Sequence, residues 1–339
     1  MCYAQQFPRF FLIILVLTVL QCSRNPISDG NNQDGEPVRN RWELRGTPAP
    51  SAILTLISDS SGNYYGGTEN EGIFISADSG KTWEPVNQGL PDLSIAQVLI
   101  DRFGHLFTAT THHGVYRWNK SDSIWEAATP ADTSAWALLA LEDGTLLAGM
   151  SNGLFRSMNW GLTWEKLGDT TITEPVLSLT IGENNLLLAG TYGDGLYASQ
   201  DFGATWQKTG LELGVINTVM IDSRDRIFAG LLGGGALRST GNLLVWESLS
   251  NSLNSNIINK FVETSGAVLF AATHGSGVFS STDGGEHWEV FNTDLTDRVV
   301  TAMMLDARGH LVVGTDSGQV FRTLLSISEP WLPPDFGDE

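Results

Sequence analysis

The chain has 339 residues, of which 42% are hydrophobic and 17% charged, and it contains 37 glycines and 11 tryptophans. This composition fits many short strands joined by tight turns better than a helical fold. The 19 basic and 38 acidic residues leave a formal net charge of -19. Because such a charge repels phosphate backbones and anionic lipid headgroups, we expect neither nucleic-acid binding nor electrostatic attraction to a membrane.

Residues 1–21 are predicted to be a lipoprotein signal peptide. Residues 10–20 form an apolar run that is too short to span a bilayer and has the length of a signal-peptide core. The sequence Val19-Leu20-Gln21-Cys22 resembles the bacterial lipobox, although a small residue is usual in place of Gln21. This resemblance implies an exported protein with a lipid on Cys22, held in the outer membrane and facing the periplasm or the cell surface. The alternative is a signal peptide cut elsewhere, which leaves Cys22 without a role.

Residues 22–40 are polar and rich in glycine and proline, which is typical of a flexible tether. Both cysteines of the chain, Cys2 and Cys22, belong to the N-terminal segment. The chain beyond the tether therefore contains no disulfide and no cysteine that could bind a metal.

A repeat begins after the tether and predicts the architecture. Seven tryptophans recur at intervals of 39 to 42 residues, and they are Trp42, Trp83, Trp125, Trp164, Trp206, Trp246 and Trp288. Each interval holds three apolar segments separated by turns, and the tryptophan segment supplies a fourth strand. The first segments are 53–57, 95–100, 136–140, 176–179, 215–219, 257–261 and 299–303. The second segments are 64–68, 106–110, 146–149, 187–191, 227–230, 269–273 and 311–315, and the third begin near residues 72, 114, 153, 195, 235, 277 and 319.

The last repeat lacks a tryptophan strand, whereas the first tryptophan has no complete repeat before it. The sequence around Trp42 matches the segment around Trp83, so the two ends of the repeat region complement each other. We therefore predict an all-β fold over residues 41–325, a seven-bladed β-propeller of four-stranded antiparallel blades. In this fold the N-terminal strand around Trp42 joins the last blade and closes the ring, which removes two open sheet edges. Residues 326–339 are expected to be an acidic C-terminal tail.

The turn before several tryptophans carries the motif Ser-x-Asp-x-Gly-x-x-Trp, in which Ser and Asp can bond backbone groups of the turn. This motif resembles the Asp-box of the BNR repeat superfamily, which includes sialidase-like, sortilin-like and photosystem II assembly factor-like propellers. The resemblance implies a propeller fold and a structural role for the motif, and it leaves the activity open. The motif residues are Ser76, Asp78, Gly80, Trp83, Asn159, Gly161, Trp164, Ser199, Asp201, Gly203, Trp206, Ser281, Asp283, Gly285 and Trp288.

The arginines do not predict a sialidase. Arg117, Arg156, Arg238 and Arg322 follow an aromatic residue or leucine at the same repeat position. They should point in equivalent directions on separate blades, whereas a sialidase needs three arginines that converge on one substrate carboxylate. No residue is therefore assigned as catalytic.

Candidate ligand-binding residues lie in the loops between the second and third strands, where the repeat is least regular. They are Glu69, Glu71, His112, His113, Tyr192, Asp194, His274 and Asp316. Adjacent residues of an extended segment face opposite ways, so His112 and His113 should not share a metal ion, and no metal or other cofactor is expected. An acid pair such as Glu69 with Asp194 or Asp316 leaves open a glycosidase-like site at the channel mouth.

These features predict a lipid-anchored, extracytoplasmic and non-enzymatic module that binds a protein or glycan ligand in the bacterial cell envelope or outside the cell. We expect it to be a monomer that meets the membrane only through its lipid. The alternatives are a glycosidase or other polysaccharide-active enzyme, and a cell-envelope assembly factor.

Overall fold

The computed structural model describes residues 41–128, 133–167, 172–212, 214–240, 243–249, 253 and 255–327. The predicted signal peptide, Cys22, the tether and residues 328–339 lie outside this range. The described residues form strands and turns and no helix. Accordingly, no helix in this part of the chain could cross a membrane.

The strands form seven antiparallel groups of four, each called a sheet here and numbered by its order in the chain; five are separate, and the fourth and fifth are continuous as one eight-stranded sheet. Sheet 1 contains β2 (Ile53–Ser58), β3 (Tyr64–Thr68), β4 (Ile73–Ser76) and β5 (Glu84–Pro85); sheet 2 contains β6 (Ile95–Ile100), β7 (Leu106–Thr110), β8 (Gly114–Asn119) and β9 (Ile124–Ala127). Sheet 3 contains β10 (Ala135–Ala140), β11 (Leu146–Met150), β12 (Gly153–Ser157) and β13 (Glu165–Leu167); sheet 4 contains β14 (Val176–Ile181), β15 (Leu187–Gly193), β16 (Leu196–Ser199) and β17 (Gln207–Lys208).

Sheet 5 contains β18 (Gly214–Ile221), β19 (Ile227–Leu231), β20 (Gly235–Ser239) and β21 (Glu247–Ser248); sheet 6 contains β22 (Ile258–Glu263), β23 (Leu269–Thr273), β24 (Gly277–Ser281) and β25 (Glu289–Val290). Sheet 7 contains β26 (Val300–Leu305), β27 (Leu311–Thr315), β28 (Val320–Thr323) and, from the other end of the sequence, β1 (Trp42–Gly46). A short pairing of Tyr192 with Val215 links sheets 4 and 5.

The second strands are largely buried, because both of their faces pack against a neighbouring sheet. Every residue of β7, β11, β23 and β27 is buried. Close packing also explains a recurrent glycine in these strands. A Cβ atom on Gly67 would lie 2.5 Å from Ile95, and one on Gly314 would lie 2.6 Å from Ile53, so only glycine fits at these contacts.

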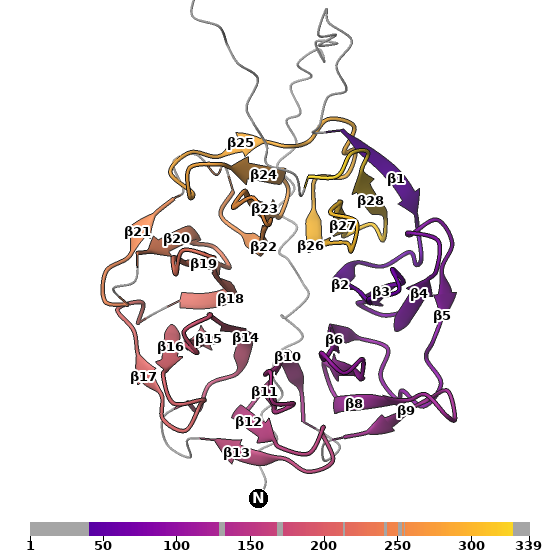
Figure 1. The fold of residues 1–339 in the computed structure, drawn as a ribbon, viewed down its shortest axis with the longest axis horizontal. Helices are drawn as coiled ribbons and strands as arrows, with labels where there is room; N and C mark the ends of the chain where they lie inside the picture. Colours follow the sequence, from indigo (N-terminus) through magenta and orange to yellow (C-terminus); the bar gives the residue numbers. More distant parts are fainter. Residues whose placement is uncertain are drawn as a thin grey trace, which may run out of the picture. The chain divides into compact units, whose positions relative to one another are not determined.

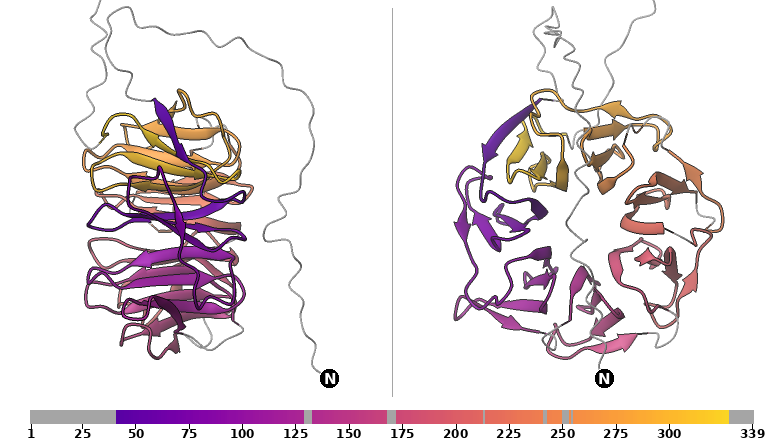
Figure 2. Two further views of the ribbon diagram at one scale, coloured as in Figure 1. Left: turned by 90° about the vertical axis from the view of Figure 1, so that its right-hand side faces the viewer. Right: turned by 180° about the vertical axis from the view of Figure 1, so that it is seen from behind.

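The sheets stand around a common centre with their first strands innermost, as in a β-propeller (Figures 1 and 2). Each innermost strand contacts the innermost strand of the next sheet, and β26 of sheet 7 contacts β2 of sheet 1. The Thr301 hydroxyl donates a 2.7 Å hydrogen bond to the Ile53 carbonyl across this junction. In sheet 7, β1 pairs with β28, and the Trp42 indole donates a 2.8 Å hydrogen bond to the Phe291 carbonyl of sheet 6.

Candidate functional site: the inner rim of the loops

One loop position recurs with the same backbone geometry in all seven sheets. A residue at or just after the end of the second strand donates its amide hydrogen bond to the carbonyl of a residue at or just before the start of the innermost strand, at 2.9 to 3.1 Å. We call these the rim positions, and they are Glu69, Thr111, Ser151, Tyr192, Leu232, His274 and Asp316. Because the backbone is equivalent while the side chains include acids, hydroxyls, an aromatic ring, an imidazole and an aliphatic group, the fold does not dictate these side chains.

Three rim residues from neighbouring sheets interact electrostatically. Burial raises the pKa of the Glu69 carboxyl, and the negative charge of Asp316 raises it further. Burial lowers the pKa of the His274 imidazole, and Asp316 opposes this effect. Sheets 6, 7 and 1 thus bring together two carboxyl groups and an imidazole that the sequence separates widely. This group can accept hydrogen bonds and attract a cationic ligand group.

Lys260, which the sequence did not single out, lies on the innermost strand of sheet 6. Its repeat position is that of Thr55, Gln97 and Ser178, whose side chains accept hydrogen bonds from the innermost strand of the next sheet. The Lys260 residue is exposed to solvent. Protein atoms packed around its amine partly desolvate the charge, which lowers the pKa of the amine. It forms no ion pair among the residues that the structure describes. A single charge within the apolar segment 257–261 was the sequence signal for it.

The remaining candidates in sheets 1 and 4 do not join this group. Asp194 forms an ion pair with Lys208 and accepts a hydrogen bond from the Tyr197 hydroxyl. These hydrogen bonds lower the pKa of the Asp194 carboxyl and tie its loop to the outer strands of sheet 4. Tyr192 holds the rim position of the same sheet with an exposed ring, and Glu71 is exposed beyond the rim.

His112 and His113 of sheet 2 both approach Asp92, which lies in the loop before β6. The Asp92 carboxylate accepts a 2.9 Å hydrogen bond from the His112 amide and lies 3.1 Å from its Nδ1. Its distance to the Nδ1 atom of His113 is 3.8 Å. The structure thus gives the two adjacent imidazoles one carboxylate partner. Within the described ranges, no group of three or more His, Cys, Asp or Glu side chains is placed to hold a metal ion.

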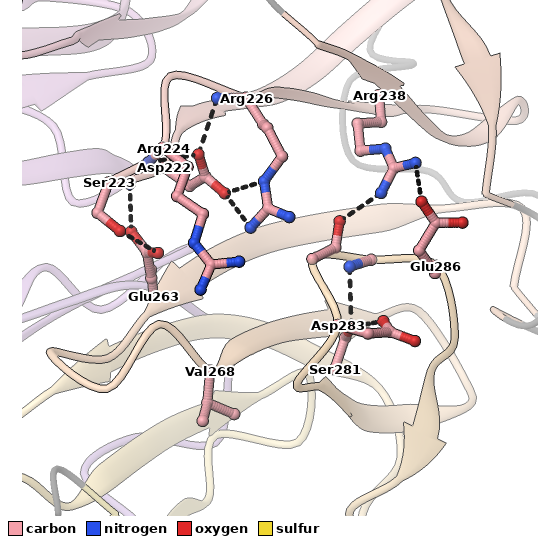
Figure 3. A network of polar contacts seen from close by, with 12 residues as sticks. Asp222, Ser223, Arg224, Arg226, Arg238, Glu263, Val268, Ser281, Asp283 and Glu286 are labelled. Carbon is pink, nitrogen blue, oxygen red and sulfur yellow. Dashed lines mark hydrogen bonds and ion pairs between the residues drawn. The ribbon is translucent and has the colours of Figure 1, made fainter. Parts of the chain in front are cut away.

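The repeated arginines bind to neighbouring strands and turns. Arg117, Arg156 and Arg238 each form an ion pair with a glutamate nine residues later, on the outermost strand of the same sheet. Arg238 also donates to Glu286 and to the Gly284 carbonyl in the next sheet (Figure 3). The Arg238 contacts join sheets 5 and 6, whereas those of Arg117 and Arg156 lie within one sheet.

The Ser-x-Asp turns also use their polar groups internally. In sheet 1 the Ser76 hydroxyl accepts from the Gly80 amide at 2.8 Å, Asp78 accepts from the Thr82 amide at 2.9 Å, and the Trp83 indole donates to the Gly80 carbonyl at 2.8 Å. The turns at Ser157, Ser199 and Ser281 repeat the serine and tryptophan bonds. Hydrogen bonds from Thr82 lower the pKa of Asp78 to about 2.

No protein-family model matches the chain. A search of curated proteins also gives no significant match. Solved structures do match. The extracellular domain of a hybrid two-component system from B. thetaiotaomicron is 18% identical with a TM-score of 0.69, over 83% of this chain and 39% of that one. YCF48 bound to D1 peptide is 15% identical with a TM-score of 0.68, over 85% and 98% of the two chains. The GH74 xyloglucanase from Xanthomonas campestris is 18% identical with a TM-score of 0.66, over 87% and 54%.

These structures show the fold of the chain, which is a β-propeller. They include extracellular domains, a peptide-bound protein and a glycoside hydrolase, so the fold is compatible with several functions. The chain spans less than half the length of the first of these proteins.

Proposed function

We propose that the chain is an exported, lipid-anchored binding module, a seven-bladed propeller of Asp-box repeats that holds a protein ligand at its inner rim. The observation that carries the proposal is the electrostatic coupling of Glu69, His274 and Asp316 at equivalent positions of three neighbouring sheets. Two coupled carboxyl groups on a chain of net charge -19 suit a ligand segment that bears lysine or arginine. The peptide complex of YCF48 is a precedent for peptide binding on this fold.

The anchor and the closed ring belong to the same proposal. Cys22 carries the lipid, residues 22–40 form the tether, and β1 closes the ring on β28. Residues 41–325 are the propeller, and the remaining 14 residues, 326–339, are the tail. Export agrees with the extracellular domains among the similar structures.

Peptide and glycan arrays probed with the full chain test the ligand class. We expect the chain to bind basic peptides, and the double variant E69Q/D316N to bind them about tenfold more weakly, because charge-assisted hydrogen bonds are lost. Glu71→Gln is the matched control, since Glu71 is exposed on the same loop as Glu69 and should bind as the unmodified chain does. Binding to glycans alone, or equal losses in both variants, would contradict the proposal.

A glycosidase is the second candidate, because one carboxyl group with a raised pKa beside another carboxyl group is the arrangement that acid catalysis of glycoside cleavage uses. The similar xyloglucanase makes xyloglucan the first substrate to try. Release of reducing sugar by the full chain, abolished in Glu69→Gln, would favour this function over simple binding.

A further inference from the structure

Exposed apolar side chains gather on the turns between the third and outermost strands of three consecutive sheets. Sheet 3 presents Met158, Trp160 and Leu162, sheet 4 presents Phe202, and sheet 5 presents Leu244 and Val245. Met158 and Leu244 are each 73% exposed, so these turns project outward rather than line a groove. We call these six residues the apolar arc, and their turns follow one another around the ring (Figure 1).

The corresponding turns of other sheets are polar. Sheet 1 has Ser79 and Lys81 there, and sheet 6 has Gly284 and Glu286. The turn of sheet 2, residues 119–123, reads Asn-Lys-Ser-Asp-Ser. The repeat therefore does not require apolar turn ends, and large exposed apolar patches on a soluble surface mark contact sites.

Two residues of the apolar arc occupy a backbone conformation that disfavours them. Trp160 and Phe202 have φ angles of 54° and 56°, at the repeat position where sheet 1 has Ser79 and sheet 6 has Gly284. A bulky side chain is uncommon in this left-handed region. Both rings are exposed, so the core of the sheet does not account for aromatic residues at these two positions.

The apolar surface extends to sheet 2. The exposed ring of Phe103 lies 6.2 Å from His105, and His105 lies 6.2 Å from Trp160, between ring centroids. Phe103 lies on the turn between the first two strands of sheet 2. This turn therefore faces the same side of the ring as the turn between the third and outermost strands of sheet 3, which carries Trp160.

The described part of the chain begins on this side of the ring. In sheet 7 Arg322 of β28 pairs with Glu43 of β1, just as Arg156 pairs with Glu165 in sheet 3. Counting back two residues from each glutamate, Arg41 is equivalent to Thr163, the residue at the end of the apolar turn of sheet 3. Arg41, the first residue that the structure describes, therefore lies on the face that carries the apolar arc.

We propose that the apolar arc lies in the interfacial layer of the lipid bilayer to which the chain is anchored, which adds a second membrane contact to the lipid expected from the sequence. This inference rests on the proposed lipid anchor, which places a bilayer within reach of this face. Tryptophan and phenylalanine among leucine, valine and methionine at projecting turn ends are the residues that enter the headgroup region. Asp201, the carboxylate of the sheet 4 turn, accepts hydrogen bonds from Ser199 and Thr205.

Tryptophan quenching tests the contact. The full chain is purified from bacterial membranes and reconstituted in vesicles of phosphatidylethanolamine with a minority of phosphatidylglycerol, some of it brominated on the acyl chains. The fluorescence of Trp160 is obtained by subtracting the tryptophan emission of Trp160→Phe from that of the unmodified chain. We expect brominated lipid to reduce this difference about twofold. Trp136 on the innermost strand β10, assayed through Trp136→Phe, is the control and should remain unquenched.

Trp160 quenching tests the apolar arc, and membrane fractionation tests the lipid anchor, so the failure of one is distinguishable from the failure of the other. Quenching of Trp160 that disappears in M158Q/L162Q/F202Q, with the circular-dichroism spectrum unchanged, supports the contact. An unquenched Trp160 overturns it, and a protein partner or a second copy then becomes the occupant to consider. Loss of membrane fractionation in Cys22→Ser reports on the anchor independently of either result.

Discussion

The hydroxyl of Tyr64 in sheet 1 donates a buried 2.5 Å hydrogen bond to the carboxylate of Asp306 in sheet 7. Arg322 donates to the same oxygen at 3.1 Å. Burial and the Asp306 carboxylate raise the pKa of the Tyr64 hydroxyl well above its usual value, so the hydroxyl stays protonated and donates. Residues at opposite ends of the repeat region thus meet at the junction that also brings Glu69 near Asp316.

Tyr64→Phe removes this bond and leaves Asp306 with fewer donors in a buried place. We expect a loss of about 1–2 kcal/mol in the free energy of unfolding, measured on the full chain in urea. Tyr65→Phe is the matched control, since the Tyr65 hydroxyl makes a longer, 3.4 Å bond to Asp59 within its own sheet. Equal losses in the two variants would argue against a special role for the junction.

The Ser-x-Asp turns predict sensitivity to acid. The pKa of Asp78, Asp201 and Asp283 is lowered from 3.8 to about 2 in the folded chain. A carboxyl group with a lowered folded pKa adds stability above pH 3.8, and this stability is lost as the pH falls toward 2. The free energy of unfolding should therefore fall between pH 4 and pH 2.

Replacing the three aspartates with asparagine should flatten this part of the pH profile. Sheet 3 already carries Asn159, which accepts from the Thr163 amide at 2.9 Å, so asparagine keeps the turn geometry. A variant with the same steep decline as the unmodified chain would show that other carboxyl groups control acid unfolding.

The proposed lipid anchor predicts the location of the chain in the cell. Cys22→Ser should move it from the membrane fraction to the soluble fraction, since the proposed anchor depends on this one residue. Cys2→Ser should leave fractionation unchanged, because Cys2 precedes the apolar run. Unchanged membrane fractionation of Cys22→Ser would defeat the anchor.

The tryptophan period was enough to predict the four-stranded sheets and the pairing of β1 with the last of them. Strand edges were harder, because the first strand of every sheet contains a register shift near its start, as between Ile53 and Thr55. This irregularity breaks the alternation of side chains on which sequence patterns depend. Predicted segments therefore differ from the observed strands by a residue at several ends, as at Ala135.

The candidate site was less accessible to sequence reasoning. Irregular loop residues were found, but nothing local indicated that Glu69 and Asp316 would interact while Asp194 would pair with Lys208. Which side chains meet depends on the twist of each sheet and on which sheets are neighbours in the ring. Lys260 was missed because its segment was treated only as an apolar strand.

The pKa of Glu69 in the full chain, followed by carbon NMR of the labelled carboxyl group, tests the central claim that sheets 7 and 1 adjoin and share an acidic rim. Asp316 raises this pKa, so Asp316→Asn should lower it, whereas Asp194→Asn should leave it in place. If the pKa of Glu69 is the same with and without Asp316, the two carboxyl groups are not neighbours, and the proposed binding site fails.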